Sequence, residues 1–529
     1  MSSGESKAVI LSGDELLKLL KNGKDKWNDW VAKNRAVHID FRGIDFVANN
    51  ISLDGMNFPE GEINFRGIKF TEATAIFSGS KFLGRVIFNE AEFSGHAGFC
   101  GVQFYSDVHF CNAKFHNNTT FCETSFHANV NFSEAEFCGY IRFEYSKFGR
   151  KADFFKTKFI DAYFCDTQFY DGEVSFLEAQ FKGYSNFQGV RFSGNKVAFH
   201  NTRFEKVDFT NTRFKGSAQF QCAQFEDNAI FFKAEFPDVD FYNTKFGDGK
   251  VVFDEAQFNG FINFNNARFA NSDVSFYSSK FSDDAVFTNL IGVDKVKKFS
   301  FKYAAFNSVF DISSEEKFGC IVDLTGTKTT NHVDLSGLRC ELQLEDGKPL
   351  GWLGRFFPNG YWTRRKIAVD KEDVARARRL KELAGANKDH DKALDFHAME
   401  MRAACKHRCF FWFNLEFWYD LLSNYGRSIA KPFWWIIFVW LAFSLVYFCL
   451  SGMTWDLWYY YLGVAMVFSA SQMLPFVPIG RNVMNEASEV LFSEYDLGGL
   501  LSLFTFFQSI LAFVLLFLFG LGLRNRFKL

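Results

Sequence analysis

The chain lacks an excess of charge of either sign and lacks the motifs of a catalytic or metal centre. Its 529 residues include 59 basic and 61 acidic side chains, so composition indicates neither a polybasic nor a polyacidic function. Residues 41–300 hold 27 basic and 32 acidic side chains, a balance that argues against binding to nucleic-acid phosphates. No nucleophile–base pair, phosphate-cradling glycine loop or metal-ligand cluster is present in the pattern. We therefore expect a protein that is not an enzyme and uses no cofactor or metal.

The cysteines lack the spacing of a disulfide or zinc framework. Their number is odd, at 11, and no CxxC pair occurs. The polar opening Met1–Lys7 predicts no cleavable signal peptide. We therefore expect free thiols in a reducing cytosol. Cys100, Cys111 and Cys122 each follow a phenylalanine at steps of eleven residues. Thiols that fill small positions are favoured over a metal or redox ladder.

Phenylalanine, in contrast, is abundant, with 73 residues, and its spacing is regular. From Phe77 to Phe159 the steps alternate between five and six residues, so the unit is eleven residues made of two shorter pieces. This period fits neither a helix nor an amphipathic strand and indicates a repeat architecture. The pattern begins at Phe41, continues to Phe287, falters at 290–298 and returns loosely afterwards.

Each pair of phenylalanines encloses two polar residues, an alanine or threonine, and one more polar residue. Examples are Phe88–Phe93 and Phe132–Phe137. The small residue two positions before a phenylalanine predicts a second inward position with little room. These residues are Ala91, Ala113, Ala135, Ala179, Ala223, Ala256 and Ala267. One large and one small buried residue per five predicts a narrow tube with one short, nearly straight side per unit.

The pattern resembles the pentapeptide-repeat family in its phenylalanine-centred form, over residues 37–345. The resemblance implies an all-β fold, a right-handed quadrilateral β-helix with phenylalanine stacked inside. The alternating steps predict coils of about 22 residues instead of about 20, roughly 11 coils from Phe41 to Phe287, and a length of about 50 Å at ~4.8 Å per coil. In such coils Cys100 and Cys122 stack on one face.

Helical segments flank the repeats. Residues 1–36 are predicted to form an N-terminal helical cap, because a solenoid needs its open ends covered. Residues 351–430 change to Ala, Leu, Arg, Lys and Glu and predict a cytosolic helical hairpin with its turn at 385–391. The aromatic stretch Phe410–Tyr419 predicts an interfacial helix.

Residues 431–529 predict a membrane domain. The uncharged runs Phe433–Leu450 and Leu500–Leu523 are long enough to cross a bilayer. Basic residues lie just before the first run and just after the second, whereas the segment between the two runs has one basic residue, Arg481. The positive-inside rule then places the N- and C-termini in the cytoplasm. We expect a multi-pass protein of the bacterial inner membrane, with lipid as a partner.

A third apolar stretch, Trp455–Phe476, predicts a re-entrant helix between the two spans. Span, re-entrant helix, loop and span are similar to the two-helix ion-channel family, the pore unit of tetrameric potassium channels, whose bacterial members often carry a pentapeptide-repeat domain. The resemblance implies an ion channel of four chains. The loop Ser469–Pro475 departs from the TVGYG-type filter of potassium channels, which leaves the permeant ion open.

The candidate pore or filter residues come from this loop and from the second span. They are Ser469, Ala470, Ser471, Gln472, Pro475 and Gln508, and the candidate charges at the pore mouth are Arg481, Glu486 and Glu489. A polar residue inside a span, as Gln508 is, marks a functional site. A hydrogen bond that holds neighbouring helices together is an equally good interpretation.

Three functions stay open from the sequence. The first is a membrane ion channel or pore, a homotetramer or other homo-oligomer, with a cytosolic β-helix as sensor or vestibule. The second is a non-conducting membrane-anchored scaffold whose β-helix recruits a protein partner. The third is a stress or anti-phage effector that depolarises the membrane. A cytosolic protein or small-molecule ligand of the β-helix is a further candidate partner, and nucleic acid is not expected.

Overall fold

The computed structural model describes residues 9–346, except 47, 50 and 71–74, together with 366–404, 415–451, 457–473, 478–492 and 498–527. The chain divides into two compact units, Met1–Gln343 and Leu344–Leu529.

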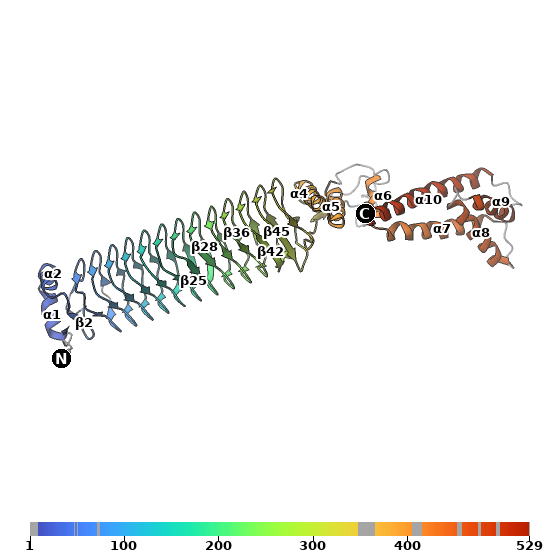
Figure 1. Ribbon diagram of the computed structural model, residues 1–529. Coiled ribbons are helices and arrows are strands. Elements are labelled where there is room, and N and C mark those ends of the chain that lie inside the picture. Colours follow the sequence, from blue (N-terminus) through green and yellow to red (C-terminus); the bar gives the residue numbers. More distant parts are fainter. Residues whose placement is uncertain are drawn as a thin grey trace, which may run out of the picture. The chain divides into compact units, whose positions relative to one another are not determined.

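The first unit is a parallel β-solenoid of about 13 coils, whose strands lie side by side in Figure 1. One coil consists of the short strands β8 (Val86–Ile87), β9 (Glu92–Phe93), β10 (Ala97–Gly98) and β11 (Gln103–Phe104). The next coil begins at β12 (Val108–His109), where Val108 lies opposite Val86. Coils of about 22 residues with four strands each are therefore confirmed. About 11 coils lie between Phe41 and Phe287, as predicted, and the total is higher because coils continue beyond Phe287.

Aromatic stacking fills the solenoid. The rings of Phe88, Phe110 and Phe132 stack with centroids 4.8 Å apart. Phe99 meets the rings of Phe88 and Phe110 edge-on at 5.8 and 5.7 Å, an arrangement that aromatic quadrupoles favour. The predicted small positions are all fully buried: Ala91, Ala113, Ala135, Ala179, Ala223, Ala256 and Ala267.

Threonine and serine at the small positions have a role that the sequence did not predict. The Thr124 hydroxyl donates to the Phe99 carbonyl of the preceding coil at 2.6 Å, and Thr157 donates to Phe132 at 2.8 Å. Both hydroxyls are buried, so each needs a partner inside the solenoid. These bonds tie one coil to the next.

At many corners of the solenoid, the residue two positions after a phenylalanine has a left-handed backbone conformation. Glu134 lies there with φ 59° and Glu90 with φ 62°, whereas Gly101 occupies the same place in another corner. A non-glycine residue in this conformation is strained by roughly 1–2 kcal/mol. Glycine relieves the strain at an entropic cost of roughly 0.5–1 kcal/mol.

We expect the substitution Glu134→Gly to raise the free energy of unfolding by about 0.5–1 kcal/mol. The Glu134 side chain is exposed, so little else is lost. Urea unfolding followed by circular dichroism measures the change. The matched control is Ser133→Gly, next to it with a negative φ, which should lower stability. Equal effects of the two substitutions would contradict the strain argument.

The N-terminal end of the solenoid is covered by α1 (Gly13–Lys21) and α2 (Lys24–Lys33). The indole nitrogen of Trp27 donates to the Asn57 carbonyl at 2.8 Å, and its ring lies edge-on to Phe58. A strand not predicted from the sequence, β1 (Ile10–Ser12), pairs in parallel with β2 (His38–Asp40). The first coil is thus closed by both a strand and two helices.

The coils lengthen where the phenylalanine pattern falters. The turn η1 (Val293–Lys295) lies between β42 (Ala285–Leu290) and β45 (Phe310–Ser314). Because Ala285 lies opposite Phe310, this coil contains 25 residues. The extra turn is accommodated without loss of parallel pairing.

The second unit is mainly helical. The strands β48 (Leu344–Asp346) and β49 (Lys366–Ala368) pair antiparallel. The remaining elements are α4 (Asp373–Ala386), α5 (His390–Ala404), α6 (Leu415–Ser423), α7 (Ala430–Leu450), α8 (Trp458–Met473), α9 (Pro478–Phe492) and α10 (Gly498–Arg526).

The helices α4 and α5 form the hairpin expected before the membrane domain. Glu400 of α5 accepts from Arg378 at 2.8 Å and from Lys381 at 2.5 Å, so charges join the two helices. Of the predicted interfacial stretch, only the part from Leu415 onward lies among the described residues, where it forms the beginning of α6.

Candidate functional site

Two helices of the second unit have the length and composition of membrane spans. The α7 helix has a mean hydropathy of 2.2 over its most apolar window, and α10 has 2.3. Only 17% and 28% of these windows are buried, whereas a core helix of a soluble protein would be mostly covered. At 1.5 Å per residue each exceeds the ~30 Å of a hydrocarbon core. Both helices can therefore cross a membrane.

The two helices run antiparallel. The side-chain amide of Asn525, near the end of α10, donates to the Gly426 carbonyl just before α7 at 3.2 Å. Large apolar side chains cover the outer faces of both helices. The most exposed are Trp434, Phe438, Leu445, Leu503, Phe506, Phe507, Phe513 and Phe517. Such a surface suits lipid or a second subunit.

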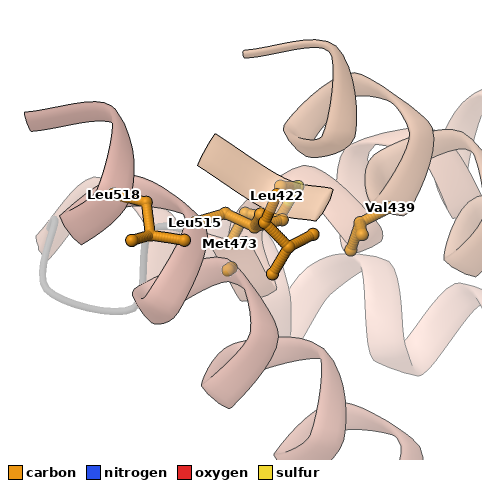
Figure 2. Close-up of a cluster of buried hydrophobic side chains, with 6 residues drawn as sticks. Leu422, Val439, Met473, Leu515 and Leu518 are labelled. Atoms are coloured by element: carbon orange, nitrogen blue, oxygen red, sulfur yellow. The ribbon is translucent and has the colours of Figure 1, made fainter. Parts of the chain in front are cut away.

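The α8 helix packs against both α7 and α10 and ends near their middle. Its Met473 packs with Val439 of α7 and Leu515 of α10, and Leu422 of α6 completes this cluster (Figure 2). Val439 and Leu515 both lie near the centre of their helices. The indole nitrogen of Trp440 donates to the Met466 carbonyl at 3.0 Å and fixes α8 along α7. The stretch predicted as a re-entrant helix thus forms the helix α8, and its re-entrant topology stays a prediction.

The next segment returns as a helix, where the sequence analysis expected a loop. Ala487 and Leu491 of α9 pack against Tyr447, near the far end of α7. A helix forms here because Pro478 suits a first helical position and because apolar residues recur on one face. The carbonyl groups inside α9 are used by its own hydrogen bonds. These carbonyl groups are therefore not free to form a filter.

A buried polar network joins α7, α8 and α10. The Gln508 amide nitrogen donates to the carbonyl and to the hydroxyl of Ser469, at 2.9 and 2.8 Å. The Tyr447 hydroxyl donates to the Gln508 side-chain oxygen at 2.8 Å, and the Ser469 hydroxyl donates to the Trp440 carbonyl at 2.9 Å. Gln508, Ser469 and Tyr447 are almost completely buried, so the network lies inside one chain and clamps its helices.

The other candidate residues are placed differently. Gln472 is buried, and its carbonyl accepts from the Ser509 hydroxyl at 3.2 Å. The half-buried Ser471 donates to the Phe468 carbonyl of its own helix, and Ala470 is exposed. Glu486 and Glu489 are exposed on α9. Pro475 and the side chain of Arg481 lie outside the described part of the chain. The lining and pore-mouth roles of these residues stay predictions.

The α8 helix has an exposed face that was not predicted from the sequence. Gly463, Val467 and Ala470 are exposed together on one side of this helix, and a Cβ atom at Gly463 would meet no atom within 4 Å. Their spacing of four and three residues places them on one helical face. That spacing of small and apolar residues is the signal in the sequence that marks this face, whereas the polar side chains Ser469 and Gln472 point to the buried side of the helix.

The comparison with known families agrees with the solenoid. The family model described as pentapeptide repeats, in nine copies, matches residues 176–221. These residues contain β25 (Gln180–Asn186) and β28 (Arg203–Asp208), which pair in parallel. No curated protein matches the chain. The first unit thus carries pentapeptide repeats, and the helical unit has two candidate membrane helices.

Proposed function

We propose that this pentapeptide-repeat protein is a membrane ion channel or pore, assembled from several copies, with its β-solenoid as a cytosolic sensor or vestibule. The observation that supports the proposal is the packing of the helix pair α8–α9: α8 ends beside the middle of α7 and α10, and α9 packs back toward the far end of α7. Backbone that turns inside a membrane is tolerated where protein covers it or where it borders a water-filled passage.

The passage lies between subunits. Within one subunit the span residues Tyr447 and Gln508 bond to each other in an apolar interior, so their polar groups are not directed at a passage. The face of Gly463, Val467 and Ala470 is open and sits on the helix that ends at mid-depth. Copies of this face, arranged around an axis, enclose the narrow part of the pore. Four copies is the number that the likeness to two-helix channels favours.

Charge at Ala470 tests the pore directly. In liposomes containing the purified protein, we expect wild type to conduct ions. Ala470→Glu should raise the ratio of cation to anion flux several-fold, and Ala470→Lys should lower it, because like charges around an axis attract counter-ions and repel co-ions. The two variants control for each other, since damage to the fold would reduce both fluxes alike. The same ratio of cation to anion flux in both variants would contradict a position of Ala470 in the lining of the pore.

A membrane-anchored scaffold is the second candidate. It is favoured by the outer faces of α7 and α10, where large apolar side chains such as Trp434 and Phe517 are exposed, as lipid requires. No ion flux from wild-type protein under voltage, pH and common-ion screens would support the scaffold over the pore. Recovery of a bound cytosolic protein on the solenoid would then define its partner.

A further inference from the structure

We propose that Cys100 and Cys122 form a reversible disulfide between neighbouring coils of the solenoid when a disulfide or peroxide oxidant is present. The two cysteines are one coil apart. Phe99 and Phe121, which precede them, stack with ring centroids 4.6 Å apart. The amide nitrogen of Gly101 donates to the Cys122 carbonyl at 2.9 Å. Cys100 and Cys122 therefore occupy the same place in successive coils.

The spacing of the coils permits the bond but strains it. Neighbouring parallel strands lie ~4.8 Å apart, and disulfides join Cα atoms about 4.4–6.8 Å apart. Parallel side chains keep their Cβ atoms near the strand spacing, however, whereas a disulfide prefers a Cβ separation of about 3.8 Å. Closing the bond must draw the coils together locally. A strained disulfide is more easily reduced than a structural one, so the pair suits a switch.

The pair is also reachable and reactive. Both side chains are partly exposed. The neighbouring Cys122 side chain lowers the pKa of the Cys100 thiol, and the charge of His96 acts in the same direction, while the Cys122 thiol itself lies 3.8 Å from the Glu144 carboxylate. In contrast, burial raises the pKa of Cys111 and raises that of Cys165 to about 11. Thiolate is the attacking form, so Cys100 is the expected nucleophile.

The chemistry needs one oxidant molecule per pair. With oxidised glutathione, the Cys100 thiolate attacks one glutathione sulfur, and the other glutathione leaves as a thiolate. The Cys122 sulfur then loses its proton and attacks the Cys100 sulfur, which displaces the second glutathione. The protein loses two electrons and two protons, and two reduced glutathione molecules result. The product links two coils covalently at one corner of the solenoid.

Peptide mapping of the full-length protein tests the proposal. The reduced, purified protein is incubated with mixtures of reduced and oxidised glutathione. Free thiols are then blocked with N-ethylmaleimide under denaturing conditions, and the protein is digested without reduction. We expect a peptide pair linked through Cys100 and Cys122, which disappears as reduced glutathione increases. Cys111 and Cys165 serve as internal controls, because their neighbours one coil away are not cysteines. Both should keep free thiols and be recovered as N-ethylmaleimide adducts.

The variants Cys122→Ser and Cys100→Ser separate the two steps. Cys122→Ser should retain glutathione on Cys100, since no second thiol can displace it. Cys100→Ser should leave Cys122 largely unmodified. A wild-type protein that keeps glutathione on Cys100 with Cys122 free would overturn the proposal. A disulfide from Cys100 to any other cysteine would overturn it as well.

Discussion

Replacing Phe154 by alanine is expected to lower the free energy of unfolding of the solenoid by about 3–5 kcal/mol. Phe154 is fully buried, and its ring stacks on Phe132 at 5.3 Å and on Phe176 at 4.7 Å. The backbone hydrogen bonds of the parallel sheets hold the coils at a fixed spacing. The cavity left by the missing ring therefore cannot collapse, and the cavity cost adds to the loss of apolar burial.

Phe155 provides the matched control, because the next side chain along the chain points outward. It is partly exposed, and the Lys156 ammonium lies 4.9 Å from its ring centroid. Phe155→Ala should cost less than about 1 kcal/mol, as an exposed cation–π contact does. Guanidinium unfolding of both variants, followed by far-ultraviolet circular dichroism, measures the difference. A Phe154→Ala effect no larger than that of Phe155→Ala would contradict the stacked-ring core.

The interior of the solenoid could be predicted because its residue pattern repeats in one dimension. Each coil contacts mainly its neighbours, so the steps between Phe77 and Phe159 determine both the coil length and which residues face inward. Features that depend on contacts between coils or with the cap, and not on the phenylalanine spacing, were not predicted. The strand β1 depends on pairing with β2 across both cap helices, and the bond from Thr124 to Phe99 depends on which coil lies beneath.

The helical unit could be predicted only in part. Length and hydropathy identified α7 and α10, because a span needs nothing more than a long apolar run. The α9 helix was missed because the likeness to two-helix channels predicts a loop there, although its apolar residues recur at helical spacing. The partners of Gln508 depend on tertiary packing: Ser469 lies 39 residues away and Tyr447 lies 61 residues away. Sequence could mark Gln508 as unusual but could not choose between a lining role and a clamp.

The substitution Gln508→Leu is expected to destabilise the helical unit by about 1–2 kcal/mol. The leucine has a similar volume, so little packing is lost. It removes the acceptor of the Tyr447 hydroxyl and the donor to Ser469, and both groups remain in an apolar interior. In the double variant with Tyr447→Phe, the hydroxyl is absent too. The double variant should therefore lose less stability than the sum of the losses in the two single variants. Thermal unfolding in detergent micelles measures all three.

Thr505→Val controls for the loss of a polar group in the same helix. The Thr505 hydroxyl donates to the Ser502 carbonyl one turn away and lies near the surface, so its loss should change stability by less than about 0.5 kcal/mol. Two readouts then separate the interpretations of Gln508. A clamp predicts lower stability and unchanged ion selectivity, because the side chain never meets the permeant ion. Unchanged stability with altered selectivity in liposomes would instead place Gln508 in the lining of the pore, and the helices would have to rearrange on assembly.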